Sequence, residues 1–331
     1  MSFMDMRTHG GGRNRKGVSV AGVRGFTLIE LMIALALGLL VVAAAGAIFL
    51  SNRQTYVATE SLGRVQESAR VAFELMARDI REAGGNPCNR HLEVANVLTN
   101  ATTDWWKTWH DGVVGYSPGG GVDMPANWVA TTDAIELKST NAGVTVVSHD
   151  PGGAVFVVDS GEHGIAGGGL ALACDFGHAA VFQVKTSADG KTISHDADQN
   201  CTTALGLPVD CSGSGTEYAF GRNAVVARVN AARWFVGTNG RGGNSLFRSA
   251  LRADETPDFE EVVEGVADMQ IQYLLPDGID YVPASAVPGT QWNEVKAVRV
   301  TIELEGDAAN AADSPIERQL SFVAAIRNRN T

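Results

Sequence analysis

An apolar run of membrane length near the N-terminus constrains this chain more than any other feature. From Leu31 to Leu50, twenty successive residues carry neither a charged nor a polar side chain. As a helix, such a run is long enough to cross the hydrocarbon core of a bilayer. One carboxylate, Glu30, lies directly before the run, and a charge within a membrane segment costs about 2.5–3.5 kcal/mol by insertion scales. Glu30 is therefore a candidate functional residue at the start of a predicted membrane-spanning helix.

Charge is divided unevenly along the chain. Residues 1–25 have a net charge of +4, from Arg7, Arg13, Arg15, Lys16 and Arg24 against Asp5. The whole chain has a formal charge of −11, so the remainder carries −11 − 4 = −15. Lys and Arg beside a membrane segment stay on the cytoplasmic side. The acidic remainder argues against a nucleic-acid partner held by its phosphates.

A single long helix is predicted from Phe26 to about Ala83. The first proline of the chain is Pro87, and Gly84 and Gly85 before it supply a helix-ending signal. Beyond the apolar run, apolar side chains recur every three or four residues on one face: Leu62, Val65, Ala69, Phe73, Met76 and Ile80. At 1.5 Å per residue the helix would be roughly 87 Å long, about three times the hydrocarbon core. Its second half must therefore leave the membrane and pack on another part of the chain.

The rest of the chain has the patterns of strands and loops. Val266–Leu275 and Val295–Glu305 alternate apolar and polar side chains, as half-buried strands do. Further strands are predicted at 134–138, 144–147, 155–158, 179–185, 224–229, 233–236, 245–248 and 320–327, with a glycine-rich hairpin turn at 237–244. These elements predict an α+β fold in which the long helix packs on a mostly antiparallel β-sheet.

The segment Gly25-Phe-Thr-Leu-Ile-Glu-Leu31, behind a basic leader, resembles the type III signal of type IV pilins and pseudopilins. The resemblance implies that a prepilin peptidase cuts after Gly25 and methylates the amine of Phe26. Glu30 would become the fifth residue of the mature chain, a position that the family uses in assembly. The implied division is a cleaved leader at 1–25, a hydrophobic transmembrane and assembly segment at 26–52, an amphipathic helix segment at 53–83 and a β-rich head at 84–331.

Later segments are similar to the minor pilin PilW family, namely 77–84, 174–183, 263–273, 295–299 and the closing Arg327-Asn328. This similarity implies a type IV pilin-like fold and a structural protein, without enzyme activity or cofactor, that primes or joins type IV pilus assembly near the fibre tip. The implied partners are other minor pilins, the major pilin, the inner-membrane assembly platform, prepilin peptidase and a tip adhesin. The protein would reside in the inner membrane before assembly and in the fibre at the cell surface afterwards, with a fibre that serves motility, adhesion or DNA uptake.

Two other functions are weighed against this one. A minor pseudopilin of type II secretion would carry the same signal, but such proteins are usually shorter, and this head is large. An envelope enzyme tethered by an uncleaved anchor would leave the Gly25-Phe26 junction and Glu30 unexplained. The chain has no H-E-x-x-H motif.

Four cysteines follow the membrane segment, and an even number in an exported domain suggests disulfides, for which three pairings exist. The ten-residue gap between Cys201 and Cys211 favours a local loop closure. Cys88 would then bond to Cys174 and tie the end of the helix to the sheet. The cysteine spacing suits no zinc site.

Two residue groups have both a ligand-binding and a structural interpretation. Asp196, Asp198 and Asn200 have the first spacings of a calcium loop, but Cys and Leu stand where Gly and Glu are needed, so a solvated loop without metal is favoured. The tryptophans Trp105, Trp106, Trp109 and Trp128 cluster ahead of the first clear strands. They could anchor a partner or stack on sugars, but packing as core is favoured.

Overall fold

The computed structural model describes residues 25–88, 92–109, 112–121, 123–185, 190–213, 215–252, 256–304 and 318–329. The predicted leader thus lies outside the described residues except for Gly25. The side chains of residues 58, 61, 62, 64–66 and 318 are likewise outside the description, and these include Leu62 and Val65 of the predicted apolar stripe. One compact unit extends to Val57 and a second begins at Ala58.

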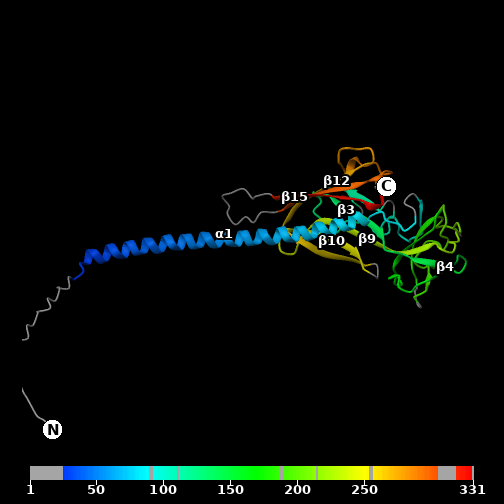
Figure 1. Cartoon of the computed structure of the whole chain (residues 1–331), viewed down its shortest axis with the longest axis horizontal. Helices are drawn as coiled ribbons and strands as arrows, with labels where there is room; N and C mark the ends of the chain where they lie inside the picture. The colour runs from blue at the N-terminus through cyan, green and yellow to red at the C-terminus, as the bar shows by residue number, and fades with distance from the viewer. Residues whose placement is uncertain are drawn as a thin grey trace, which may run out of the picture. The chain divides into compact units, whose positions relative to one another are not determined.

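The predicted long helix is present as α1, Leu28–Glu82, a single helix of 55 residues (Figure 1). It begins two residues later than predicted because Thr27 caps it. Ala83 and Gly84 follow it, and Gly84 has φ of +66°, a left-handed conformation that suits glycine at the end of a helix. The sequence therefore specifies both ends of α1 locally.

The first unit has no core among its described residues. Every residue from Gly25 to Val57 is exposed. Leu28–Val57 is the only helical segment among the described residues with the length and composition of a membrane span. Its apolar side chains cover the whole circumference of the helix, so the surface they present needs lipid or other helices around it.

The described residues of the second unit form the end of α1 and fifteen strands. The strands are β1 (Val94–Asn96), β2 (Val113–Tyr116), β3 (Ala134–Thr140), β4 (Val144–Asp150), β5 (Val155–Val158), β6 (Leu170–Cys174), β7 (Ala179–Gln183), β8 (Thr192–Ser194), β9 (Val225–Thr238), β10 (Asn244–Leu251), β11 (Pro257–Glu264), β12 (Val266–Leu274), β13 (Val282–Pro283), β14 (Ala297–Leu304) and β15 (Arg318–Ala325). Three short 3-10 helices, Ala284–Ala286, Trp292–Glu294 and Arg327–Arg329, complete the elements.

Strand β9 organises the larger, eleven-stranded sheet. Its first residues pair with β4 and β6, and its later residues pair with β3 and β10, all antiparallel. Figure 1 shows β9 running between the region of β10 and the region of β4. Among the described pairs only β1 with β7 is parallel. The mostly antiparallel sheet that the sequence predicts is thus confirmed, although β9 is one strand where two were expected.

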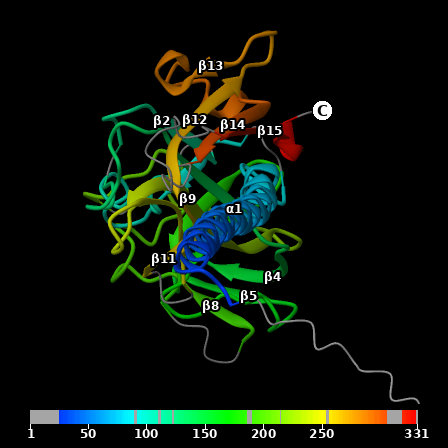
Figure 2. The ribbon, with the colours of Figure 1, turned by 90° about the vertical axis from the view of Figure 1, so that its left-hand side faces the viewer.

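The end of α1 packs on the second sheet, whose strand order is β13-β12-β14-β15. Met76 and Ile80 of α1 are fully buried in one cluster with side chains of β12, β14 and β15. Complete burial of such a side chain stabilises a fold by about 1.5–3 kcal/mol. Figure 2 looks along α1 and shows these strands beside it. The predicted inward alternation of β12 and β14 is confirmed: Met269, Ile271, Tyr273, Val298, Val300 and Ile302 are all buried.

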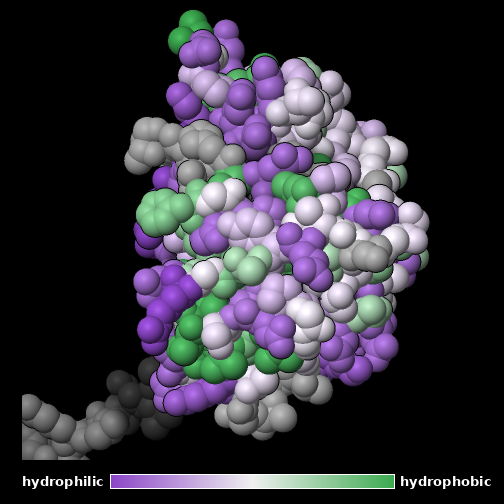
Figure 3. All heavy atoms as spheres, turned by 90° about the vertical axis from the view of Figure 1, so that its right-hand side faces the viewer, coloured by the Kyte–Doolittle hydropathy of each residue, from purple (hydrophilic) through white to green (hydrophobic). Residues whose placement is uncertain are grey.

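A second hydrophobic cluster lies among β4 to β8 and the loops that follow them, with Phe156, Phe182 and Phe220 buried at its centre. Figure 3 shows the face of the head on the right of Figure 1, where small hydrophobic groups interrupt a largely hydrophilic surface. Val147 of β4 and Val157 of β5 are 39% and 38% exposed. Apart from such partly exposed side chains, the apolar residues of this cluster are buried and form core.

Candidate functional site

Among the residues that the structure describes, none packs against the predicted processing junction. An added Cβ at Gly25 would meet no atom within 4 Å, and Phe26 is 88% exposed. A peptidase needs close access to the backbone at the bond it cuts, and a residue without a side chain permits that approach. The geometry is compatible with the predicted cut between Gly25 and Phe26.

Glu30 lies in the first turn of α1 and forms a reciprocal pair with Thr27. The Glu30 N–H donates to Thr27 Oγ1 at 3.3 Å, and the Thr27 N–H donates to Glu30 Oε2 at 3.4 Å. The Thr27 hydroxyl also donates to the same carboxylate oxygen, at 3.3 Å. This is a capping box, in which two otherwise unpaired N–H groups of a helix start are satisfied. The negative charge of Glu30 also lies at the positive end of the helix dipole.

The sequence motifs did not single out Thr27, which the structure adds to this segment as the capping partner of Glu30. The signal that would have found it is the spacing Thr-x-x-Glu directly before an apolar run, which is typical of a helix start. Together the residues Gly25, Phe26, Thr27 and Glu30 form one short segment, here called the N-terminal site, ahead of the exposed apolar span.

Asp79 attaches α1 to the sheet of β9 and β10. Its carboxylate accepts the indole N–H of Trp234 at 2.9 Å and the Arg248 Nε–H at 2.8 Å, and Arg248 Nη2 donates to its other oxygen at 3.2 Å. Trp234 is fully buried, and the Arg248 guanidinium lies 5.9 Å from the centre of its ring. The position of α1 on the head is thus set by polar bonds as well as by apolar packing.

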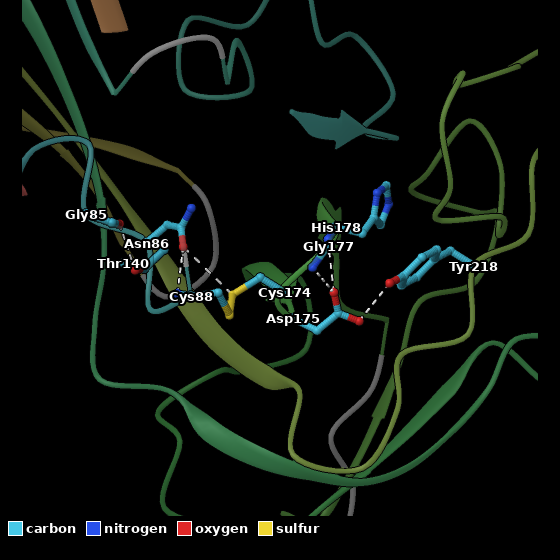
Figure 4. The surroundings of a disulfide bond; sticks show 9 residues. All are labelled: Gly85, Asn86, Cys88, Thr140, Cys174, Asp175, Gly177, His178 and Tyr218. Carbon is cyan, nitrogen blue, oxygen red and sulfur yellow. Dashed lines mark hydrogen bonds between the residues drawn. A yellow bond between two sulfur atoms is a disulfide. The ribbon is translucent and has the colours of Figure 1, made fainter. Parts of the chain in front are cut away.

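The four cysteines form the two pairs expected from the sequence. Cys88 bonds to Cys174 with an S–S distance of 2.04 Å, and Cys201 bonds to Cys211. The first bond links the segment after α1 to the end of β6 (Figure 4). Asn86 supports it, because its side-chain oxygen accepts the Cys88 N–H at 2.7 Å. The exit of the helix is therefore tied covalently to the larger sheet.

Two of the four tryptophans are buried in the head, as the core interpretation predicts. Trp105 and Trp109 are 3% and 8% exposed, whereas Trp106 and Trp128 are half-buried. The guanidinium of Arg233 lies 4.5 Å above the Trp105 ring, a cation–π contact.

Arg233 belongs to a buried ionic group formed by adjacent strands. It pairs with Glu136 of β3, and Lys138 Nζ lies 3.3 Å from the other oxygen of the same carboxylate. All three side chains are buried. Glu136 is opposite Arg233 in the β3–β9 register, and Lys138 lies two residues after Glu136 on the same strand. Their mutual pairing offsets the cost of burying each charge. The Trp105 ring thus covers a satisfied ionic group in the head.

The residues with calcium-loop spacing have other partners. Lys185 Nζ lies 2.8 Å from a carboxylate oxygen of Asp196 and 2.8 Å from one of Asp198. The Asn200 amide is buried and bonds the backbone of Gln183, which donates to Oδ1 at 2.8 Å and accepts from Nδ2 at 2.9 Å. These bonds give the three residues structural roles in joining loop 195–200 to β7 and the segment after it.

A pair of histidines lies in the second hydrophobic cluster. The Nε2 atoms of His149 and His195 are 3.1 Å apart, and the Phe220 N–H donates to His149 Nδ1 at 3.1 Å. His149 therefore carries its proton on Nε2 and donates to His195. Each imidazole has a pKa lowered to about 4, mainly by burial, and for His195 the neighbouring His149 contributes to this lowering. Both rings are neutral at pH 7, which suits their contact with Phe156 at 4.0 Å and 5.3 Å between ring centres.

Two known family models match this chain, one at the N-terminal site and one in the head. Residues 21–46 match the family model of the Prokaryotic N-terminal methylation motif, which includes the whole N-terminal site. Residues 233–324 match that of Type IV Pilus-assembly protein W, PilW. The chain thus carries a prepilin methylation motif and, in its head, a PilW region. No curated protein and no solved structure matches it.

The PilW match begins within β9 and ends within β15, so it includes the sheet that holds the end of α1. PilW is a family of structural pilins that take part in type IV pilus assembly, and the methylation motif is that of prepilins. The methylation motif of this chain implies the pilus machinery and prepilin peptidase as partners. Together with the apolar helix, the motif is consistent with anchoring in the inner membrane before assembly. The family match favours the pilus over type II secretion.

Proposed function

We propose that this protein is a minor pilin that primes type IV pilus assembly and enters the fibre near its tip. The observation that carries the proposal is the N-terminal site: a prepilin motif at an exposed helix start, with one carboxylate directly before the exposed apolar run of residues 31–50. In the precursor the span crosses the inner membrane. Prepilin peptidase cuts after Gly25 and methylates the amine of Phe26.

In this proposal Glu30 sets the register between subunits. Cleavage creates a positive amine on Phe26, and in a bundle of pilin helices the amine of one subunit can face Glu30 of another. A desolvated ion pair roughly balances its burial cost, whereas a lone buried charge is penalised by several kcal/mol. Subunits docked with Phe26 against Glu30 are therefore tolerated, and slipped ones are disfavoured. Before this partner binds, the capping box with Thr27 holds the Glu30 carboxylate at the helix start.

In this proposal, successive segments of the chain have different roles. The apolar span at 26–52 packs among the helices of other subunits once it leaves the membrane, because its whole circumference is apolar. The segment 53–83 carries the head at 84–331. The partners are other minor pilins, the major pilin, the inner-membrane assembly platform and a tip adhesin.

Replacement of Glu30 tests this function. We expect Glu30→Ala to be cleaved and to reside in the inner membrane, but to be absent from sheared fibres or to leave the cells with few fibres. The matched control is Glu60→Ala, which removes an exposed carboxylate from the same helix outside the apolar run. Glu60→Ala should enter fibres as the parent does. Glu30→Ala in sheared fibres at the parental level, with normal fibre numbers, would overturn the assignment.

A further inference from the structure

The turn between β6 and β7 displays an aromatic side chain that the head does not use. Phe176 is 96% exposed, the largest exposure of any large hydrophobic residue among the described ones. A Phe side chain gains about 1.5–3 kcal/mol when it is fully buried. Phe176 contributes almost none of this to its own fold, so the gain is available to a contact with another molecule.

The turn that carries Phe176 is braced on both sides. Asp175 Oδ1 accepts the N–H groups of Gly177 and His178 at 2.8 Å and 2.9 Å, and the Asp175 N–H donates to the His178 carbonyl at 2.9 Å. Asp175 Oδ2 accepts the hydroxyl of Tyr218 at 2.8 Å. Figure 4 shows the bonds from Gly177, His178 and Tyr218 converging on the Asp175 carboxylate, next to the Cys88–Cys174 disulfide. The backbone around Phe176 is therefore held by four hydrogen bonds and an adjacent covalent link.

The brace continues into the core. His178 is buried, its Nε2 lies 2.6 Å from the Leu205 carbonyl, and its ring centre is 4.2 Å from that of Tyr218. Tyr218 in turn contacts Phe220, whose ring belongs to the second hydrophobic cluster. Ordering a flexible loop is one of the main costs of binding, and a turn that is already ordered avoids it. A Phe side chain adds only two rotatable bonds to be fixed.

We propose that Phe176 is the anchor of an interaction surface that inserts into an apolar pocket of a different pilus protein. A rigid, exposed aromatic side chain is the type of residue that dominates binding energy when a pocket desolvates it. The proposal rests on the proposed role in pilus assembly for the identity of the partner as a pilus protein. It adds where the partner binds and what chemistry its binding site has.

Charge decides the class of partner. Asp175 precedes Phe176, and the exposed Glu217 precedes Tyr218, which bonds to Asp175, so two carboxylates belong to the turn and to the segment that braces it. Acidic side chains disfavour anionic lipid surfaces, and the net charge of −11 − 4 = −15 beyond residue 25 disfavours a second copy of this chain. The complementary site is an apolar pocket with Lys or Arg at its rim.

Site-specific cross-linking locates the partner. The photoreactive residue p-benzoylphenylalanine is placed at position 176 of the full chain in fibre-producing cells, and at position 279 as a control. Ile279 is a matched control because it is 93% exposed in the connection between β12 and β13. We expect position 176, and not position 279, to give an adduct with a different pilus protein, at apolar residues flanked by Lys or Arg. Adducts with lipid, with a second copy, or at an acidic surface would overturn the proposal, as would equal yields at the two positions.

Affinity measurements with the purified full chain and the cross-linked protein test the energetic role. We expect Phe176→Ser to raise Kd about tenfold or more, Phe176→Tyr to change it only slightly, and Ile279→Ser to leave it unchanged. Since Phe176 is exposed, all variants should keep the parental unfolding midpoint. Equal Kd values for parent and Phe176→Ser would contradict the proposal. This outcome is distinct from a failure of the proposed function, which the Glu30→Ala fibre measurement reports separately.

Discussion

Thr27 and Glu30 satisfy each other's N–H groups at the start of α1, through bonds of 3.3 Å and 3.4 Å between backbone and side chain. The carboxylate that we propose sets the register between subunits therefore has a local structural partner within its own chain. This pairing keeps the first helical turn formed directly after Phe26, whose amine the proposed cleavage would release. In the proposed fibre, the orientation of Glu30 toward a neighbouring subunit would then depend on Thr27.

The first prediction concerns this dependence. Replacing an N-cap threonine costs about 1 kcal/mol, which corresponds to roughly a fivefold shift toward a frayed turn. We expect Thr27→Val to speed amide hydrogen exchange at residues 28–31 by about fivefold in detergent micelles, whereas Thr27→Ser keeps the parental rate. Thr55→Val, in an exposed interior turn of the same helix, is the control. Unchanged exchange in Thr27→Val would show that the capping box does not hold the turn.

The second prediction concerns the attachment of α1 to the head. Asp79→Ala leaves the buried indole N–H of Trp234 and the guanidinium of Arg248 without their shared acceptor. Loss of a buried acceptor for charged and neutral donors costs about 2–4 kcal/mol. For a domain of this size, about 3 kcal/mol lowers Tm by roughly 6–12 °C. Thermal unfolding of the purified protein measures this loss.

The matched control for Asp79 is Arg78→Ala, at the neighbouring, exposed position of the helix. Arg78 pairs with Glu82 at 3.1 Å, but their side chains are 72% and 52% exposed. Exposed pairs of this spacing contribute about 0.3–0.5 kcal/mol. A Tm loss for Asp79→Ala no larger than that for Arg78→Ala would contradict the role of Asp79.

The third prediction concerns acid. The unfolded chain binds a proton at His195 with a pKa near 6.5, whereas the folded protein binds it only near 4. As pH is lowered, His195 is protonated in the unfolded state before it is protonated in the folded state. The free energy of unfolding therefore decreases as pH falls from about 6.5 to about 4. Since His195 is fully buried, its share is about 3 kcal/mol. His149, whose pKa is also lowered to about 4, acts in the same direction.

Comparison with His195→Phe isolates this effect from the titration of carboxylates. We expect the parent to lose more stability than His195→Phe between pH 7 and pH 4, with both measured as free energy of unfolding in denaturant. The charged groups next to the pair, Asp150 and Asp196, are present in both proteins. Parallel stability curves for the two proteins would contradict the prediction.

The fourth prediction concerns the disulfides. The residues of the Cys88–Cys174 bond are 86 apart in sequence, and those of Cys201–Cys211 are 10 apart. In the chain-entropy account a longer loop confers more stability, about 4–5 kcal/mol against about 3 kcal/mol here. We expect the double serine variant of the first pair to lose more stability than that of the second. An intact mass showing four free thiols in protein from the envelope would contradict both bonds.

Most of the fold could be predicted where a regular pattern is long. The apolar run and the stripe ending at Ile80 predict α1, and alternation predicts β12 and β14. Strand β6 was missed because all five of its residues are buried, so no alternation marks it. Strand β11 was missed for the opposite reason: it pairs only with β10 and carries several acidic residues, as edge strands do.

The candidate site could be predicted only in its local part. Gly25, Phe26 and Glu30 lie within six residues, so their spacing is readable from the sequence. Asp79 and Arg248 are 169 residues apart, and only the folded sheet brings them together. The exposure of Phe176 likewise depends on the length of β6 and on Tyr218, which is distant in sequence.

The measurement that tests the account most directly is the N-terminus of the protein recovered from sheared fibres. Mass spectrometry should find the chain there, beginning at Phe26 with a methylated amine. That result requires cleavage at Gly25, retention of the apolar span and entry into the fibre. A chain that begins at Met1, a cut on the C-terminal side of Leu50, or absence from the fibres of cells that express it would contradict the account.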